Sequence, residues 1–258
     1  MTNTLSLPEL QNVRGLTRFL LFFCLVSSAA IGQIHPHFGI QVGVPLTDTL
    51  SSSYFSSSNA GGTSTDRYNS KTKRLLVGPA FRVELVRGLG LEFDALYQRV
   101  DYDHFTLNSS GSLLNQSFEQ GRGDRWQFPL LVQYAFKLAG TTPFIEAGPT
   151  ISRITNVSGQ VSAKTMYANT PSSNSSSTYQ SVGTSATRAG FTAGGGVDFP
   201  LGHVHLRPEF RYAHWFAASN SSTGIFAAAL FPVAVPVAVP ANFRTNQNEA
   251  SFLLGISF

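Results

Sequence analysis

The chain has one cysteine, little charge and no long hydrophobic segment beyond its amino terminus. Cys24 lies in a stretch that we expect to be removed on export, so neither a disulfide framework nor a thiolate metal site is expected. Charged residues make up 12% of the 258 residues, yet no run of about 18 apolar residues follows the amino terminus, which argues against helical membrane spans. Removing Glu9, Arg14 and Arg18 lowers the formal charge from +4 to +3, too little to indicate nucleic-acid binding.

The amino terminus has the order of an export signal. Arg14 and Arg18 precede an apolar run, and small residues follow it as far as Gly32. This order predicts a signal peptide over residues 1–32, with cleavage after Ala30 as the alternative. A short buried helix is the other interpretation.

Glycine, serine, threonine and aromatic residues are abundant in the rest of the chain, which favours short strands joined by polar loops, in a sandwich or a barrel. The clearest strand is WQFPLLVQYAFK, 126–137. Its alternate residues from Trp126 to Phe136 are apolar, with aromatic residues at both ends. At roughly 3.3 Å per residue and a tilt near 40°, this row rises about 25 Å, the height of the apolar band on an outer-membrane barrel.

The same alternation recurs along the chain and predicts eight strands. They cover 37–46, 74–85, 91–98, 126–137, 143–152, 188–199, 204–212 and 248–258. Short and long connections alternate between them, as expected for a barrel with tight periplasmic turns and long extracellular loops. We expect solvated loops at 46–68, 103–123, 155–187 and 216–246.

Several segments together carry a family resemblance. They are FGIQVGVPLTD, VGPAFRVEL, WQFPLLVQYAF, FIEAGP, RPEFRYAHW and the terminal SFLLGISF. With these the chain resembles the small outer-membrane β-barrel proteins of Gram-negative bacteria, the OmpA and OmpX-like eight-stranded class. The resemblance implies an all-β fold, an eight-stranded antiparallel transmembrane β-barrel over 33–258, located in the bacterial outer membrane.

The last strand is similar to the signal by which such barrels are recognised. Phe258 ends it, with apolar residues at alternate positions before it, although Gly255 stands two residues later than the glycine often seen there. The resemblance therefore implies the outer-membrane barrel assembly machinery and outer-membrane lipid as partners, no nucleic acid, and a monomer.

A period of two does not by itself say which face of a strand is inside, so a soluble barrel with its apolar rows inward is the alternative. Glycines on the polar face suit a crowded bore, and aromatic row ends suit membrane interfaces, which favours the membrane barrel. We place at the interfaces Trp126, Phe128, Tyr134, Phe136 and Phe258. Prolines within four strands predict bulges or strand ends at Pro79, Pro129, Pro149 and Pro208.

The inward face carries charged residues that we expect to pair and to fill the bore as a polar network. The residues are Arg82, Glu84, Glu92, Asp94, Glu146, Asp198, Arg207, Glu209, Arg211 and Glu249. A filled bore predicts a structural core in preference to a conduction path.

No catalytic, cofactor or metal site is expected. Glu92 and Asp94 share a face as paired carboxylates would, but in a filled bore. His214 and Ser219 are five residues apart and so fall on opposite faces, unlike the arrangement in lipid A deacylases. Two same-face histidine pairs, His35 with His37 and His203 with His205, lack a third metal ligand.

These patterns predict a non-enzymatic surface or envelope protein that makes contacts through its loops. A narrow passive pore and a lipid A-modifying enzyme are the alternatives. The segment VAVPVAVP, 233–240, is expected to be extended and to pack over the barrel mouth or contact a partner.

Overall fold

The computed structural model describes residues 35–71, 73–86, 88–136, 138, 140–167, 170–180, 186–216, 220–230 and 233–258. The backbone alone is described for β9 (Thr170–Gln180), β12 (Asn220–Leu230) and β13 (Val233–Arg244). The predicted signal peptide lies outside the described residues. Within the described ranges, no helix is long and apolar enough to cross a membrane.

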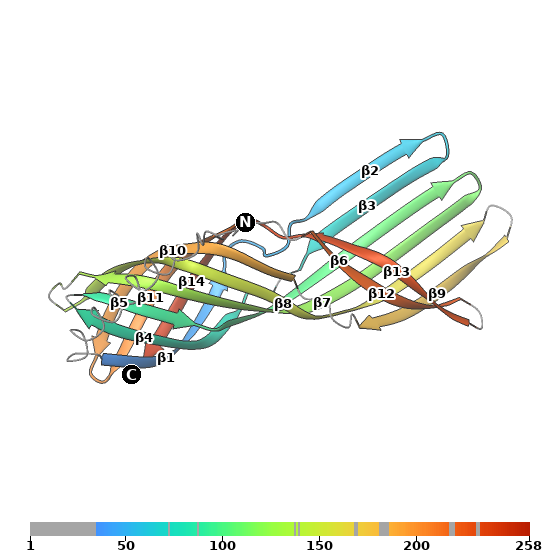
Figure 1. Ribbon diagram of the computed structural model, residues 1–258. Coiled ribbons are helices and arrows are strands. Elements are labelled where there is room, and N and C mark those ends of the chain that lie inside the picture. The colour runs from blue at the N-terminus through green and yellow to red at the C-terminus, as the bar shows by residue number, and fades with distance from the viewer. Residues whose placement is uncertain are drawn as a thin grey trace, which may run out of the picture.

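Antiparallel strands close into a barrel at the left of Figure 1. Its wall consists of β1 (His35–Pro45), β4 (Leu76–Val86), β5 (Leu89–Asp94), β6 (Leu96–Ser110), β7 (Leu113–Ala135), β8 (Thr142–Tyr167), β10 (Ala186–Leu201), β11 (Val204–Trp215) and β14 (Asn248–Ser257). Strands β5 and β6 occupy one wall position, since both pair with β7 in one register. The first strand, β1, pairs with the last, β14, and β7 pairs with β8, so the barrel is closed with eight wall positions, as predicted.

The four prolines, expected at bulges or strand ends, do not end the strands of the wall. They lie inside β4, β7, β8 and β11. Between β7 and β8, pairing is interrupted after Pro129–Thr150 and resumes at Val132–Ala147 without a change of register. A missing N–H therefore costs local hydrogen bonding but leaves each side-chain row on its face.

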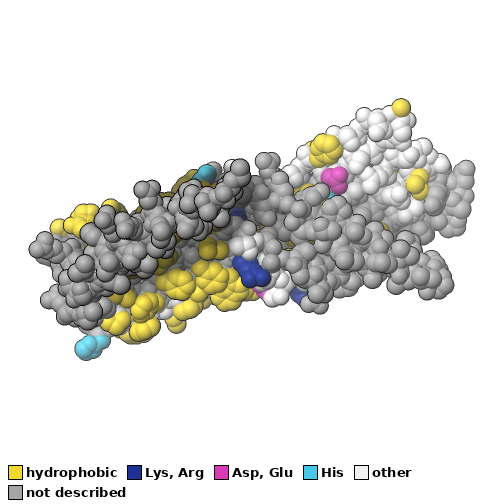
Figure 2. All heavy atoms as spheres, in the orientation of Figure 1, with side chains coloured by type: hydrophobic (Ala, Val, Ile, Leu, Met, Phe, Trp, Pro, Cys, Tyr) yellow, Lys and Arg dark blue, Asp and Glu magenta, His cyan; other side chains and the backbone are white. Residues whose placement is uncertain are grey.

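The apolar rows face outward, which answers the question that the sequence left open. Ile145 is 57% exposed, and Leu130, Val132 and Phe210 are exposed to a similar degree. Between them, in the same strands, buried residues alternate toward the bore. Figure 2 shows the exposed apolar side chains gathered over the barrel end of the molecule, and few of them over the opposite end. The predicted interface aromatics Trp126, Tyr134, Phe136 and Phe258 are exposed on this surface, and Phe128 is half-buried there.

The long connections, expected as solvated loops, are formed largely of paired strands in the described residues. Three of the four long connections continue the barrel strands as a paired sheet that stands beyond the barrel at the right of Figure 1. In the first, β2 (Ser53–Asn59) and β3 (Gly62–Ser70) form a hairpin that adds to β6. The long strands β7 and β8 stay paired through this extension, and β9 adds to β8. In the fourth, β12 and β13 form a separate hairpin, so the backbone of the segment 233–240 is extended, as expected.

Candidate functional site

Arg211 lies at the centre of the bore and contacts four carboxylates. The period of two on β5, β8 and β11 turns these side chains inward from three wall positions. The guanidinium donates to Glu92 at 2.7 Å, to Asp94 at 2.5 Å and to Glu146 at 2.7 Å. Glu209 lies 2.8 Å from the same group. All five residues are buried, so this cluster is held without bulk solvent.

A second group lies next to this cluster, toward the end of the barrel with the short connections. Arg207 donates to Glu92 at 2.7 Å, which joins the two groups. Arg82 donates to Asp198 at 3.0 Å, and the His205 ring nitrogen Nδ1 lies 2.8 Å from the other oxygen of that carboxylate. His205 thus faces an acid in place of the histidine pair considered from the sequence.

A third group fills the bore toward the extension, and the sequence pattern missed most of it. Arg125 donates to Glu249 at 2.7 Å and to Gln98 at 3.0 Å. Arg188 donates to the same Glu249 and stacks over the Trp215 ring, 4.2 Å from its centroid. A void of ≈ 20 Å³ separates this group from the central cluster, room for about one water molecule.

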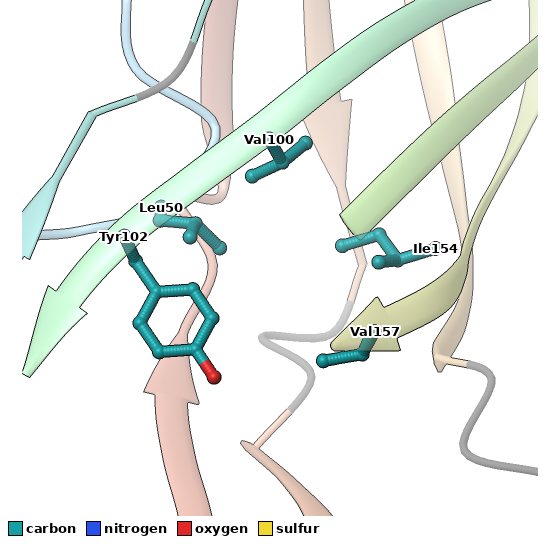
Figure 3. Packing of buried hydrophobic residues seen from close by; sticks show 5 residues of the cluster. All are labelled: Leu50, Val100, Tyr102, Ile154 and Val157. Atoms are coloured by element: carbon teal, nitrogen blue, oxygen red, sulfur yellow. The ribbon is translucent and has the colours of Figure 1, made fainter. Parts of the chain in front are cut away.

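An apolar cluster closes the outer end of the bore above these charges. Figure 3 shows its five side chains converging from β6, β8 and the segment after β1. Each is no more than 5% exposed, and the void among them is ≈ 10 Å³. The members are Leu50, Val100, Tyr102, Ile154 and Val157. Charged groups and this cluster together occupy successive levels of the bore.

Of the ten residues predicted for the bore, nine are buried there and one is not. Glu84 is exposed, because β4 ends two residues later at Val86 and position 84 lies at the mouth of the barrel. The nine buried residues divide between the three groups above. Their burial and ion pairing are those of a structural network.

Glycines let the wall strands approach closely around these groups. A Cβ at Gly148 would lie 2.1 Å from the carbonyl oxygen of Leu130, and one at Gly78 would lie 1.9 Å from that of Ala95. Gly255, on the same inward face, has space for a Cβ at 3.5 Å from Arg207. The crowding inferred from inward glycines therefore holds at particular positions and not along the whole row.

Charged residues follow directly beyond the aromatic end of the apolar band. Arg153 pairs in register with Trp126 and is exposed, and Arg99 lies on the neighbouring β6. Asp124 is the acid among them, and hydrogen bonds from Asn156 and Tyr97 hold its pKa below the usual range.

A histidine cluster ties together three strands of the extension. His104 Nδ1 lies 3.3 Å from Glu119 on β7, and Nε2 lies 3.3 Å from Asp66 on β3. The Thr106 hydroxyl lies 2.9 Å from Asp66 and 3.1 Å from His104 Nε2. Tyr68 stacks on the imidazole with ring centroids 3.8 Å apart. Strand alternation did not indicate this cluster, because its residues fall in segments that were expected to be loops.

His214 lies near the end of β11. Its ring nitrogen Nδ1 lies 2.8 Å from the Asn248 side chain at an exposed position on β11. Ser219 lies outside the described residues, so the structure does not test that pair.

A closed barrel with outward apolar rows, charged side chains inside and strands that extend past one rim defines a transmembrane β-barrel of the outer-membrane type. The comparison with protein families agrees. The chain belongs to the outer membrane protein beta-barrel domain family, whose sequence profile matches residues 32–216. The family is one of the bacterial outer membrane.

Solved structures of three outer-membrane proteins are similar over most of the chain. Ail, the attachment invasion locus protein of Yersinia pestis, solved with the heparin analogue sucrose octasulfate, is 10% identical, with 86% of this chain and 97% of that chain covered and a TM-score of 0.34. Neisserial surface protein A is 14% identical, covering 88% and 99%, with a TM-score of 0.31. The outer membrane protease OmpT from Escherichia coli is 7% identical, covering 86% and 96%, with a TM-score of 0.35. No curated protein matches the chain.

Proposed function

We propose that this chain is a non-enzymatic surface protein, in which a closed barrel is the membrane anchor and the extended sheet is the contact surface. The observation that carries the proposal is the length of the wall strands. Strand β7 has 23 residues and β8 has 26, whereas about 10 residues suffice to cross the membrane. The remaining residues of β7 and β8 form paired strands outside the lipid. They provide an ordered surface that is not needed to span the membrane.

The outer face of the extension supports this proposal. A hollow of ≈ 450 Å³ lies on it across β6, β7 and β8, lined by polar and charged side chains. Lys71 pairs with Asp103, and Arg99 pairs with Asp101, so the charges along it are mostly held in pairs. A surface whose charges are already fixed can bind a polar partner with little loss of side-chain freedom.

Two partners and a monomeric state belong to this proposal. Outer-membrane lipid would contact the exposed apolar rows, with Arg153 placed for its phosphates. The barrel assembly machinery would recognise β14 and the Phe258 that follows it. The barrel would be a monomer, since its wall closes on itself and exposes no unpaired strand edge in the membrane.

The test is a deletion that removes the β2–β3 hairpin of the extension and leaves the barrel strands intact. Cells that display the full chain are compared with cells displaying a variant in which residues 53–69 are replaced by a short turn. Binding to host-cell surfaces or matrix glycans should fall in the variant while the amount of heat-modifiable barrel in the membrane is unchanged. Equal binding by both would count against a contact role for this hairpin.

Conductance tests the alternative of a narrow pore. Because three charged groups and an apolar cluster occupy the bore, the purified chain should show no single-channel events in planar bilayers. The lipid A mass spectrum of expressing cells should be unchanged as well. Regular channel openings, or a loss or gain of an acyl chain, would favour the pore or the lipid A-modifying enzyme.

One observation favours a second candidate function, hydrolysis by the histidine cluster. Thr106, His104 and Glu119 stand in the order of nucleophile, base and orienting acid, so the hydroxyl proton could pass to Nε2 as the oxygen attacks a carbonyl. Thr106 also bonds Asp66, and Tyr68 covers the imidazole, which favours a structural role. An ester probe hydrolysed by the full chain and not by Thr106→Val would support catalysis, and equal rates would exclude it.

A further inference from the structure

The central cluster of the bore carries more negative than positive charge. With all six groups ionised, Glu92, Asp94, Glu146 and Glu209 against Arg207 and Arg211 leave two negative charges unbalanced within the cluster. The outer group has one positive charge in excess, since Arg125 and Arg188 share Glu249, but it lies across the void. The adjoining Arg82 and Asp198 balance one another. An uncompensated charge in a sealed interior costs far more than one in water, so the cluster calls for a counter-charge.

Three carboxylate oxygens of the cluster could receive such a counter-charge. Arg211 occupies one oxygen on each of Asp94, Glu146 and Glu209, and the second oxygen of each has no hydrogen-bond partner. These side chains are at most 3% exposed, so bulk water does not satisfy them. A buried carboxylate oxygen without a donor is costly, and here three of them lie in one cluster.

Three of the carboxylates have the spacing of a ligand set. Glu92, Glu146 and Glu209 each offer an oxygen, and these oxygens lie within 4.8 Å of one another. They come from β5, β8 and β11, three separate positions of the wall, so one ion between them would join strands across the bore. An all-oxygen donor set suits hard cations, and Ca²⁺ tolerates its irregular geometry better than Mg²⁺ does.

We propose that the barrel binds one divalent cation of the oxygen-preferring class, Ca²⁺, between Glu92, Glu146 and Glu209. Two positive charges balance the two excess negative charges of the cluster. Arg207 and Arg211 then act as positioning groups. Arg207 holds Glu92 by Oε2, and Arg211 holds Glu146 by Oε1. Glu92 Oε1 would bind the ion while it also accepts from Gln41 and Arg211. The ion is structural and ties the middle of the barrel together from inside.

The competing explanation is that two of the four carboxylates carry protons. The two explanations differ in what a paired amide substitution does. Glu146→Gln with Glu209→Gln removes two ligands and also removes two negative charges, so it mimics the protonated cluster. If protons balance the wild type, this variant should be as stable as the wild type and neither should hold metal.

The test uses the full chain refolded from urea into detergent micelles free of lipopolysaccharide, because that lipid itself binds divalent cations. Refolding is done in Ca²⁺, Mg²⁺ or EDTA, the protein is desalted, and metal is measured by mass spectrometry. Refolding is required because a sealed bore exchanges ions slowly. The exposed acid Glu84 supplies the matched control, Glu84→Gln.

The wild type and Glu84→Gln should each retain about one Ca²⁺ per chain, and the double variant should retain at least about tenfold less. The unfolding midpoint should be higher in Ca²⁺ than in EDTA for the first two proteins and the same in both for the double variant. The proposal is overturned if the wild type retains no metal and its unfolding midpoint is the same in Ca²⁺ and in EDTA. This outcome is measured on the wild type alone, so it does not depend on whether a variant folds. Retention of Mg²⁺ in preference to Ca²⁺ would overturn the choice of ion.

Discussion

Replacing Arg211 with methionine should destabilise the barrel more than any other single change in its wall. The substitution keeps a long unbranched side chain but removes the guanidinium that contacts four carboxylates. Arg207 then remains as the only arginine of the cluster, and it contacts Glu92. Removing one partner of a buried ion pair costs about 3–5 kcal/mol. A value near 4 kcal/mol would lower the ratio of folded to unfolded chain roughly a thousandfold.

The measurement is urea unfolding in micelles, followed by the gel mobility of unboiled samples. Arg153→Met is the matched control, because Arg153 is exposed on the outer face and its loss should change stability by less than about 0.5 kcal/mol. Adding Glu146→Gln to Arg211→Met should recover part of the loss, since one unpaired charge is removed. If Arg211→Met and Arg153→Met unfold at the same urea concentration, the bore charges do not stabilise the barrel and the reasoning fails.

Three further predictions concern the wall and its extension. Gly148→Ala should lower stability by about 1–3 kcal/mol through overpacking, while Gly255→Ala, which has space for its methyl group, should be nearly neutral in the same urea titration. Leu130→Arg, in the middle of the lipid-facing row, should cost about 2–4 kcal/mol, and a cost near zero would show that this row does not face lipid. Deleting the β2–β3 hairpin should leave the heat-induced mobility shift intact, because the hairpin pairs only with the part of β6 outside the barrel; loss of the shift would show that the extension is needed for folding.

The barrel wall was predictable because alternation is a local property. A strand with one face in lipid and one in a filled bore must repeat every two residues, and all eight predicted segments are strands. The direction of the rows was harder, since the period is the same for both faces. It was the glycines on the polar face and the aromatic ends of the apolar rows that indicated which face is inside.

The extension was missed for a physical reason. β2 reads SYFSSSN and is exposed throughout, so nothing in its composition signals burial. Its pairing with β3 continues a sheet that the barrel strands have already begun, and backbone hydrogen bonds hold it. Composition reports whether a segment can form a core, and this segment needs none.

The outer bore group was out of reach of local patterns as well. Arg125 stands one residue before the predicted span, and Glu249 is far away in the sequence. Whether they meet depends on the stagger of strands around the closed barrel, which no single segment encodes. Glu84 shows the opposite error, since it was predicted to lie in the bore and is exposed. Alternation assigns a residue to a face of the strand but does not say where the strand leaves the bore.

The hairpin formed by β6 and β7 stays paired along its whole length in the extension, so it is an ordered projection and not a flexible loop. The part of β7 before Trp126 rises about 40 Å along the strand at roughly 3.3 Å per residue. Its turn lies at Gly111, which has a φ of 56° and no atom within 4 Å of an added Cβ. A peptide epitope inserted there would be held at a fixed height above the lipid, clear of the sugar layer closest to the membrane. The same geometry presents this turn to an antibody or a bacteriophage beside the end of β8, which stays paired with β7 up to Leu113–Tyr167.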